Sequence, residues 1–186
     1  MLELVRNPLP FSSDRVSLRR FSPGDLTAFQ TYRHDAELGR FQGWSSQSDR
    51  EALQFIVEMA EAPLFLPDHW NQLVIEDVAL GSMVGDLGIF TSKDGQQAEI
   101  GFTLSRQAQG VGLATQATRL AISLIFESTA VQQILGITDT RNLASAKLLE
   151  RVGMRRRETR SGLFKGLPCQ EYVYAISRQD AGHLGS

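Results

Sequence analysis

A glycine-containing loop between a predicted strand and a predicted long helix constrains the fold of this chain most. The pattern Gln109-Gly110-Val111-Gly112-Leu113-Ala114 lies between the strand Glu99–Leu104 and the helix Gly112–Glu127. Closely spaced glycines let backbone amides turn toward one ligand without obstruction by side chains. The helix that follows adds unpaired N–H groups and the positive end of the helix dipole. The segment therefore predicts an anion site that suits a pyrophosphate.

Three phosphate-binding patterns can be compared with this loop. A P-loop requires Gly-Lys-Ser/Thr, and that sequence does not follow here. A Rossmann fingerprint requires a third glycine, where this chain has Thr115, and no regular βαβ unit precedes the loop. A Gln/Arg-x-x-Gly-x-Gly/Ala pattern fits the whole segment Gln109–Ala114. A glycine turn that only connects strand and helix is the remaining alternative, because two glycines alone are a modest signal.

The hydrophobic periodicity of the chain predicts one mixed α/β domain over residues 1–178 and a flexible tail over residues 179–186. The predicted strands cover residues 15–19, 70–75, 83–90, 99–104, 131–138, 154–160 and 171–177. One predicted helix begins near Ser22, and three others cover residues 48–61, 112–127 and 142–152. The apolar positions of the second helix, spaced three or four residues apart, are Leu53, Ile56, Val57 and Ala60. A turn at Gly166-Leu167-Pro168 separates the last two strands, and the order of elements is β-α-α-β-β-β-α-β-α-β-β.

The composition disfavours several classes of protein. The 186 residues are 42% apolar and 22% charged, which is typical of a globular domain and not of a disordered, collagen-like or coiled-coil chain. The 19 basic and 21 acidic residues give a net charge of −2, which argues against a dedicated nucleic-acid-binding protein. No apolar run has the length of a signal peptide or a membrane span, so we expect no membrane partner and a cytoplasmic location.

The cysteine and histidine content argues against redox and metal chemistry. Cys169 is the single cysteine, which excludes an internal disulfide and favours a reducing compartment. Because no histidine partner is visible for it, Cys169 is predicted to be a small apolar residue and not a nucleophile. His34, His69 and His183 are scattered without the spacing of metal ligands, so we expect no metal.

Short motifs over nearly the whole chain, from Val16 to about Ile176, resemble those of the GNAT superfamily of acetyl-coenzyme A-dependent N-acetyltransferases. The closer likeness is to its RimJ/RimL-type branch, which includes ribosomal-protein N-terminal acetyltransferases. In chain order the motifs are Leu18-Arg19-Arg20 with Asp25, Val84-Gly85-Asp86, Glu99-Ile100-Gly101-Phe102, the loop Gln109–Ala114, Asn142-Leu143-Ala144-Ser145, and Leu148–Met154. Each motif is weak alone, whereas their order and spacing together are specific.

This resemblance implies a sheet in which the strands 99–104 and 131–138 diverge, with the co-substrate acetyl-CoA in the gap. The backbone of Phe102, Thr103 and Leu104 would pair with the pantetheine arm like an added strand, and Asn142 would bind the arm from the other side. The amides that hold the pyrophosphate would be those of Gln109, Gly110, Val111, Gly112, Leu113, Ala114 and Thr115. Lys147 could meet the adenosine phosphates, although an exposed helix lysine is equally typical of solvated surface.

The reaction implied by the resemblance is direct transfer of an acetyl group to a neutral amine. Glu99 is the candidate general base, because related enzymes often place a glutamate there; the alternative is a strand glutamate paired with a neighbouring lysine or arginine. Ser145 is the candidate acid for the leaving thiolate, as in RimL-type enzymes, since Leu149 stands where many GNAT enzymes carry a tyrosine. The alternative for Ser145 is a hydroxyl bonded to its own helix backbone.

The acceptor is the least constrained part of this interpretation. Phe41, Trp44 and Trp70 would form an acceptor wall, with ordinary aromatic burial as the alternative. The last hairpin has Pro168-Cys169-Gln170-Glu171 where the branch often has an acidic residue after an aromatic one, so acceptor binding there is in doubt. The acceptor is expected to be a peptide or protein N-terminus, or a small-molecule amine such as an antibiotic or a polyamine. A non-catalytic coenzyme A-binding module is the competing function, and a homodimer is frequent in the superfamily.

Overall fold

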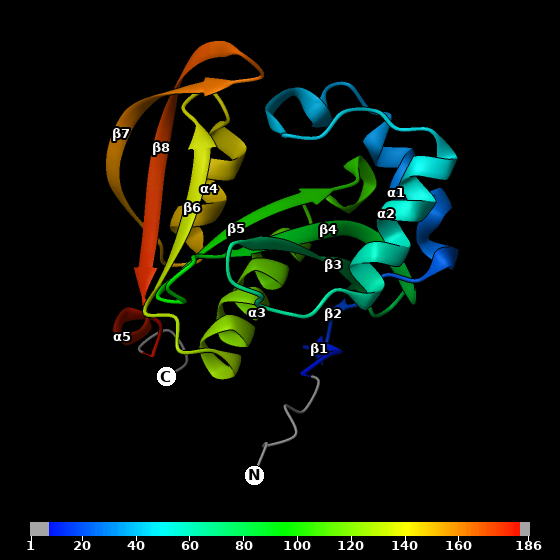
Figure 1. The fold of residues 1–186 in the computed structure, drawn as a ribbon, viewed down its shortest axis with the longest axis horizontal. Helices are drawn as coiled ribbons and strands as arrows, with labels where there is room; N and C mark the ends of the chain where they lie inside the picture. The colour runs from blue at the N-terminus through cyan, green and yellow to red at the C-terminus, as the bar shows by residue number, and fades with distance from the viewer. Residues whose placement is uncertain (1–7, 183–186) are drawn as a thin grey trace.

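The structure, a computed structural model, describes residues 8–182 and contains one continuous sheet (Figure 1). Its eight strands lie in the order β1-β2-β3-β4-β5-β6-β8-β7. The strands are β1 (Phe11–Ser12), β2 (Val16–Arg19), β3 (His69–Asp77), β4 (Ser82–Thr91), β5 (Gln97–Leu104), β6 (Gln133–Asp139), β7 (Arg155–Phe164) and β8 (Leu167–Ser177). The helices are α1 (Leu26–Arg33), α2 (Asp49–Glu61), α3 (Leu113–Ser128), α4 (Leu143–Arg151) and α5 (Arg178–Ala181), with 3-10 turns η1 (Pro23–Asp25), η2 (Leu38–Phe41) and η3 (Arg106–Ala108). The predicted mixed α/β architecture is confirmed, and β1 and α5 are additional to the predicted elements.

The centre of the sheet opens into a V between β5 and β6. These two strands run parallel and pair only over Gln97–Glu99, opposite Gln133–Leu135. Beyond this point β5 stays paired with β4 as far as Leu104, whereas β6 stays paired with β8 as far as Asp139. Because each strand follows a different neighbour, the two diverge (Figure 1). The divergence predicted for this pair of strands is confirmed.

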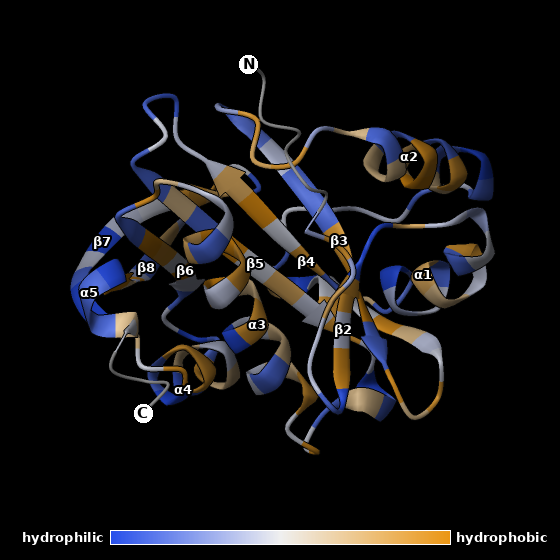
Figure 2. Ribbon diagram, turned by 90° about the horizontal axis from the view of Figure 1, so that it is seen from below, coloured by the Kyte–Doolittle hydropathy of each residue, from blue (hydrophilic) through white to orange (hydrophobic). Residues whose placement is uncertain are grey.

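Helices cover both faces of the sheet and create two hydrophobic clusters. On one face, α1 and α2 pack Phe29, Tyr32 and Ile56 over Val74 of β3. On the opposite face, α3 packs against alternate residues of the central strands, such as Leu87 of β4. Figure 2 shows hydrophobic bands across the central strands and a mainly hydrophilic β7. Full burial of one large apolar side chain contributes roughly 1.5–3 kcal/mol, so these clusters are the main stabilising feature of the fold.

Two residues of the Val84-Gly85-Asp86 motif have clear structural roles. Gly85 lies so close to β5 that an added Cβ would stand 2.2 Å from the carbonyl oxygen of Thr103. Asp86 is 1% exposed, and its carboxylate accepts hydrogen bonds from the Tyr32 hydroxyl at 2.7 Å and from the Arg33 guanidinium at 2.5 Å. This buried network fixes α1 on the sheet, next to the open end of the V.

A second motif, around Arg19, joins β2 to the first helix. The Arg19 guanidinium donates to both carboxylate oxygens of Asp25, at 2.8 and 2.9 Å, and also pairs with Glu76 of β3. Asp25 in turn accepts from the backbone N–H of Ser22 at 2.8 Å, as the acidic member of a capping box does. The motif therefore stabilises the start of the first helical segment.

The last hairpin differs from the prediction. β7 continues to Phe164 and β8 begins at Leu167, so Leu167 and Pro168 lie in a strand and not in the turn. The turn consists of Lys165 and Gly166, whose φ angles of +50° and +77° are typical of a two-residue hairpin connection. The prediction was wrong because a proline was taken as a turn residue. β6 does not reach this part of β8, so one edge of the strand is free there and no ladder hydrogen bond is lost.

The tail predicted over residues 179–186 begins within the last described helix. Residues 178–181 form α5, whose N-cap Ser177 accepts a hydrogen bond from the Asp180 N–H at 3.0 Å. The guanidinium of Arg178 donates to main-chain carbonyls after α3, including Thr129 at 2.7 Å. The start of the expected tail is therefore helical, and residues 183–186 lie outside the described residues.

The second helix is present as predicted, but its buried side is narrower than its apolar pattern. Leu53 and Val57 are 37% and 42% exposed, whereas Ala52 and Ile56 are fully buried. The helix begins after Ser48, whose side chain accepts a hydrogen bond from the backbone of the first turn. Its remaining apolar side chains are available to line a cavity above the sheet.

Candidate functional site

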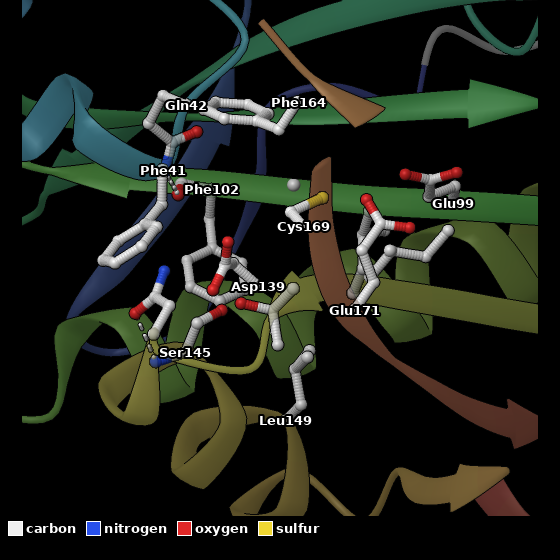
Figure 3. A pocket seen from close by; sticks show the side chains of 15 residues that line it. Phe41, Gln42, Glu99, Phe102, Asp139, Ser145, Leu149, Phe164, Cys169 and Glu171 are labelled. Carbon is white, nitrogen blue, oxygen red and sulfur yellow. Dashed lines mark hydrogen bonds between the residues drawn. The ribbon is translucent and has the colours of Figure 1, made fainter. Parts of the chain in front are cut away.

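The open end of the V holds a pocket of about 180 Å³ (Figure 3). Its walls come from the divergent parts of β5 and β6, the first turns of α4, the β7–β8 hairpin and the segment that contains η2. Five residues predicted for the site, although distant in sequence, line this pocket: Phe41, Glu99, Phe102, Asn142 and Ser145. Figure 3 shows Glu99 and Glu171 toward one end of the pocket and Phe41 toward the other.

Three carboxylates line the pocket, and arginines neutralise two of them. Asp139 is paired with Arg141 at 2.7 Å, and Glu171 is paired with Arg160 at 3.1 Å. The carboxylate of Glu99 has no hydrogen bond or ion pair with any residue from 8 to 182. The alternative of an ion-paired strand glutamate therefore does not describe Glu99.

The surroundings of Glu99 change its proton affinity. Burial raises the pKa of Glu99 above its ordinary value of 4.5, because the charged form loses hydration. The positive charge of Arg160 opposes this rise in pKa, and the negative charge of Glu171 adds to it. By contrast, the hydrogen bond from Arg141 lowers the pKa of Asp139. Of the three carboxylates, Glu99 therefore combines a raised pKa with the absence of an ion pair within residues 8–182.

Helix α4 brings three of the residues considered in the sequence to the pocket. Asn142 caps the helix, and its Oδ1 accepts a hydrogen bond from the Ser145 N–H at 3.2 Å. Within residues 8–182 the Ser145 hydroxyl makes no hydrogen bond, so the alternative of a hydroxyl bonded to its own backbone is not observed. Leu149 is 1% exposed and packs against Gly136 of β6. Ser145 therefore supplies the hydroxyl group that α4 offers to the pocket.

The edge of β5 that faces the V carries backbone groups that β4 does not use. The alternation of hydrogen bonds in the β4–β5 pair points the backbone of Phe102 and Leu104 into the V, and that of Thr103 toward β4. The Phe102 carbonyl accepts from Gln42 Nε2 at 3.2 Å, and the Leu104 carbonyl accepts from Gln109 Nε2 at 3.0 Å. An extended chain in the V could pair with this edge as an added strand.

The loop before α3 has the geometry of an anion site. Gly110 and Gly112 have φ angles of +78° and +88°, which glycine adopts without a Cβ penalty. Gly112 is the N-cap of α3 and has no side chain that could satisfy the first N–H groups. The loop from Gln109 to Gly112 is exposed, whereas Leu113 and Thr115, in the first turn of α3, are buried. Within residues 8–182 no side chain caps the first amides of α3, so they are available to an anion.

Two arginines that the sequence analysis did not single out contact this loop. Arg15, before β2, donates to the Val111 carbonyl at 3.1 Å. Arg151, at the end of α4, donates to the Thr115 hydroxyl at 3.3 Å. Both add positive charge beside the free amides. Lys147 is exposed on α4 and lines neither of the pockets described here.

A second pocket, of about 480 Å³, lies beside the first on the α1–α2 face of the sheet. Three residues line both pockets: Gln42, Gly101 and Phe102. Trp44 and Trp70 line the second pocket, whereas Phe41 lines the first. The three aromatic residues expected in one acceptor wall are therefore divided between two adjoining pockets.

The sequence analysis missed several residues of the V pocket. Cys169, expected to be a plain apolar residue, is half-buried there beside Glu171, and Asp139 and Gln42 also line the pocket. Cys169 and Glu171 are two positions apart on β8, so they share one face of the strand. This alternation could not be recognised in the sequence because the strand was expected to start only at Glu171. With these residues included, the pocket is closed by the hairpin as well as by α4.

Residues 8–182 contain neither a cluster of metal ligands nor a helix that could span a membrane. In this range no group of three His, Cys, Asp or Glu side chains is placed to hold a metal ion. His34 and His69 instead contact backbone carbonyls, and His183 lies outside the range. No helix in the described part of the chain is long and apolar enough to cross a membrane.

A family model described as the acetyltransferase (GNAT) domain matches residues 15–155. A relative, the uncharacterised N-acetyltransferase p20 of Bacillus licheniformis, is 23% identical over 145 residues, which cover 77% of this chain and 81% of the relative.

Several solved structures share the fold. A GNAT-family acetyltransferase from Bacillus anthracis has a TM-score of 0.81 at 18% identity and covers 91% of this chain and 98% of its own. A candidate ribosomal-protein-serine acetyltransferase from Vibrio cholerae has a TM-score of 0.72 at 19% identity, with coverage of 90% and 96%. The microcin C7 self-immunity acetyltransferase MccE, in complex with acetyl-CoA and AMP, has a TM-score of 0.75 at 15% identity, with coverage of 89% and 93%. At these identities the likeness establishes the fold.

Proposed function

This chain belongs to the acetyltransferase (GNAT) domain family, and on that premise we propose that it transfers the acetyl group of acetyl-CoA directly to the primary amine of a peptide or protein N-terminus. Family membership makes the chain an N-acetyltransferase that acts on an amine. The RimJ/RimL-type resemblance of its motifs supports the N-terminal acceptor. The fold likeness to the Vibrio cholerae candidate ribosomal-protein-serine acetyltransferase points the same way.

The V and the α3 loop together fit the two ends of acetyl-CoA. The backbone groups of Phe102 and Leu104 are placed to pair with the amides of a pantetheine arm. The amides at the start of α3 suit the pyrophosphate, with Arg15 and Arg151 adding positive charge. Asn142 lies in the wall of the V across from that edge. When bound, acetyl-CoA supplies a thioester whose carbonyl carbon is attacked by the amine and whose sulfur leaves as a thiolate.

The observation that carries the proposal is the carboxylate of Glu99 in the V pocket, which is paired with no residue from 8 to 182. An α-amino group has a pKa of about 8, so at neutral pH most of it carries a proton that must be removed before attack. Glu99 takes this proton, directly or through a water molecule. Asp139 and Glu171 are less suited because Arg141 and Arg160 hold them as paired anions.

Ser145 is the proton donor that we assign to the leaving thiolate. Its hydroxyl lies in the same pocket as Glu99 and has no competing hydrogen bond within residues 8–182. A thiolate with a pKa of about 8.5 can leave without full protonation. The contribution of Ser145 is therefore expected to be smaller than that of Glu99.

Mass spectrometry of peptides incubated with the purified chain and acetyl-CoA tests this function. The expected product carries one acetyl group on the α-amine of a peptide with a free N-terminus. A matched peptide with a blocked N-terminus and an internal lysine is the control. Acetylation of spermidine or kanamycin, with none on the α-amine, would replace the N-terminal acceptor by a small-molecule amine. Binding of acetyl-CoA without acetylation of any of these amines would favour a non-catalytic module.

A further inference from the structure

The second pocket occupies the space next to the proposed base. It shares Gly101 and Phe102 with the V pocket. Along β5, side chains alternate, so Glu99, Gly101 and Thr103 are directed to one face of the sheet. Gly101 and Thr103 line the second pocket, so this is the face that α1 and α2 cover. An amine held at Glu99 therefore has the second pocket as its neighbouring space.

Two paired glycines form the floor of the second pocket. Gly88 of β4 and Gly101 of β5 lie opposite each other in the sheet. Gln72 and Trp70 lie over Gly88, where an added Cβ would stand 2.4 Å from Gln72 Oε1 and 3.1 Å from the Trp70 ring. An added Cβ at Gly101 would meet no atom within 4 Å. The floor is therefore covered on the β3 side and open on the side next to Glu99.

The walls of the second pocket are largely aromatic and apolar. They are formed by Trp44, Phe55, Met59 and Trp70. Phe102 also lines the pocket, but along β5 its side chain alternates to the other face of the sheet. Trp70 is 48% exposed although it packs against Phe90 with ring centres 5.6 Å apart. A volume of about 480 Å³ lies in the range of ligand pockets and accommodates one large side chain. An apolar group that enters this pocket would cover the exposed face of Trp70 and gain the hydrophobic free energy of that burial.

The charged groups of the second pocket neutralise each other. Asp86 and Arg33, which are 1% and 6% exposed, form an ion pair. The Arg33 guanidinium also lies 4.6 Å from the ring centres of both Phe29 and Trp44. If an acceptor placed an ammonium group in this pocket, in addition to the reacting amine at Glu99, that group would lose its hydration without gaining a free carboxylate, which is costly. The pocket therefore selects against polycations and in favour of a neutral apolar group.

Three buried polar atoms of this pocket's residues have no hydrogen-bond partner within residues 8–182. They are Arg33 Nε, Trp44 Nε1 and Gln72 Oε1. Such unpartnered atoms are uncommon in folded proteins. All three atoms are covered by neighbouring groups, so they lie behind the pocket surface and are not offered to a ligand. The surface that the pocket presents to a ligand is therefore mainly apolar.

Given the proposed function, on which this inference rests, we propose that the second pocket binds the side chain of the acceptor's N-terminal residue and that the enzyme prefers a bulky apolar or aromatic residue there. Phenylalanine, leucine and methionine have this chemistry. Polyamines and aminoglycosides carry several ammonium groups and do not suit a pocket whose carboxylate is already paired with Arg33. The preference for phenylalanine over alanine is expected to reach about 10-fold or more in kcat/KM.

A set of peptides that differ only in their first residue tests this preference. The kcat/KM is measured with acetyl-CoA for N-terminal Phe, Leu, Ala and Lys, with spermidine and kanamycin alongside. Phe and Leu are expected to exceed Ala and both polycations by about 10-fold or more. Equal values for all first residues, or faster acetylation of the polycations, would overturn the inference while the transferase function stands. No acetylation of any amine would overturn both.

Substitutions in the pocket locate the preference. Trp70→Ala removes a wall, and Gly101→Val fills the open floor with a side chain that suits a strand. Both are expected to lower the Phe-to-Ala ratio of kcat/KM by about 10-fold. The matched control is Leu80→Ala, since Leu80 is 69% exposed and lines neither pocket. The same ratio in all three variants would contradict the assignment of this pocket.

Binding can also be followed without turnover. The chain has two tryptophans, Trp44 and Trp70, and both line the second pocket. A peptide with N-terminal Phe is expected to change their fluorescence, with half-saturation at a concentration about 10-fold lower than a peptide with N-terminal Ala. Identical titrations with the two peptides, or no change with either, would contradict occupancy of this pocket by the first side chain.

Discussion

The proposed cofactor side of this enzyme and its proposed acceptor side consist of different chemical groups. The cofactor side is mainly backbone: the β5 edge at Phe102 and Leu104, and the amides at the start of α3. The acceptor side is mainly side chains, such as Trp44 and Trp70, which converge from separate elements over two paired glycines. The two sides meet at Gly101 and Phe102, close to the proposed base.

This difference explains how one fold can keep a co-substrate and change its acceptor. A site made of backbone depends on the path of the chain and requires particular residues at few positions, such as glycine at positive φ. A site made of side chains can be altered one residue at a time without a change of fold. The fold alone does not identify the acceptor, because one fold hosts many acceptors, so the side chains of the proposed acceptor side are the guide to it.

The largest expected effect is a loss of stability on breaking the buried ion pair that lines the second pocket. Asp86→Ala leaves the Arg33 guanidinium buried without its partner, and should lower the free energy of unfolding by about 3–5 kcal/mol in urea denaturation. The matched control is Arg106→Ala, which breaks the exposed pair with Asp35 and should change stability much less. Equal losses in the two variants would contradict the role given to the buried pair.

The next effect concerns the residue where the two sides meet. Glu99→Gln should lower kcat/KM by about 100-fold or more at neutral pH, because the amine loses its general base. In the unmodified enzyme the acidic limb of the pH profile is set by the raised pKa of Glu99, so it lies above pH 4.5. In the variant that limb should vanish, and the rate should follow the neutral amine up to a pH of about 8. An unchanged pH profile would remove Glu99 from the mechanism.

A pair of variants can separate the two sides directly. Gly112→Ala forces a Cβ into a φ of +88°, at a cost of roughly 1–2 kcal/mol that moves the loop away from its anion-binding shape. Acetyl-CoA should then bind about 10-fold more weakly, while the peptide titration followed by tryptophan fluorescence stays the same. Trp70→Ala should leave the affinity for acetyl-CoA unchanged in calorimetry and should lower kcat/KM for the peptide with N-terminal Phe. If each variant weakened both ligands equally, the division into two sides would be wrong.

A smaller effect is expected at the leaving group. Ser145→Ala removes one hydroxyl donor, and one hydrogen bond contributes about 1 kcal/mol, which corresponds to about a 5-fold loss in kcat. The KM values for acetyl-CoA and for the peptide should stay unchanged. A kcat equal to that of the unmodified enzyme, measured in single-turnover experiments, would assign the proton to another donor.

The smallest expected effect is a gain of stability. Because burial raises the pKa of Glu99, the stability linked to its protonation is present below pH 4.5 and is lost as the pH rises through the folded-state pKa. Glu99→Gln removes this loss, so the variant should unfold at a higher urea concentration at pH 7 and at the same concentration below pH 4.5. A less stable variant at pH 7 would contradict the cause given for the pKa shift.

The loop and the helix start of the proposed cofactor side could be predicted from the sequence because their signals are local. Gly110 and Gly112 stand next to the helix that they precede, and Asn142 stands at the start of α4. The divergence of β5 and β6, in contrast, came from the resemblance and not from the residues. Arg15 and Arg151 were missed, since their contact with the loop depends on how distant elements pack.

The acceptor side could be predicted only as a set of aromatic residues. Nothing local in the sequence shows that Trp44 and Trp70 meet across a glycine pair, or that Phe41 lies in the other pocket. The pairing of Asp139 and Glu171 with arginines, which leaves Glu99 as the unpaired carboxylate of the V pocket, also depends on strand register and side-chain packing. The arrangement of the proposed acceptor side therefore depends on tertiary packing, whereas the loop before α3 follows from local sequence pattern.

Calorimetric titration with acetyl-CoA, with ADP as the comparison ligand, tests the assignment of the V and the α3 loop most directly. ADP carries the adenosine and the pyrophosphate but lacks the pantetheine arm, so it can contact the loop and not the β5 edge. Acetyl-CoA is expected to bind at one site per chain and at least about 10-fold more tightly than ADP, a difference of about 1.4 kcal/mol. Equal affinities would show that the V is not used, and no binding of acetyl-CoA would show that the loop only connects β5 to α3.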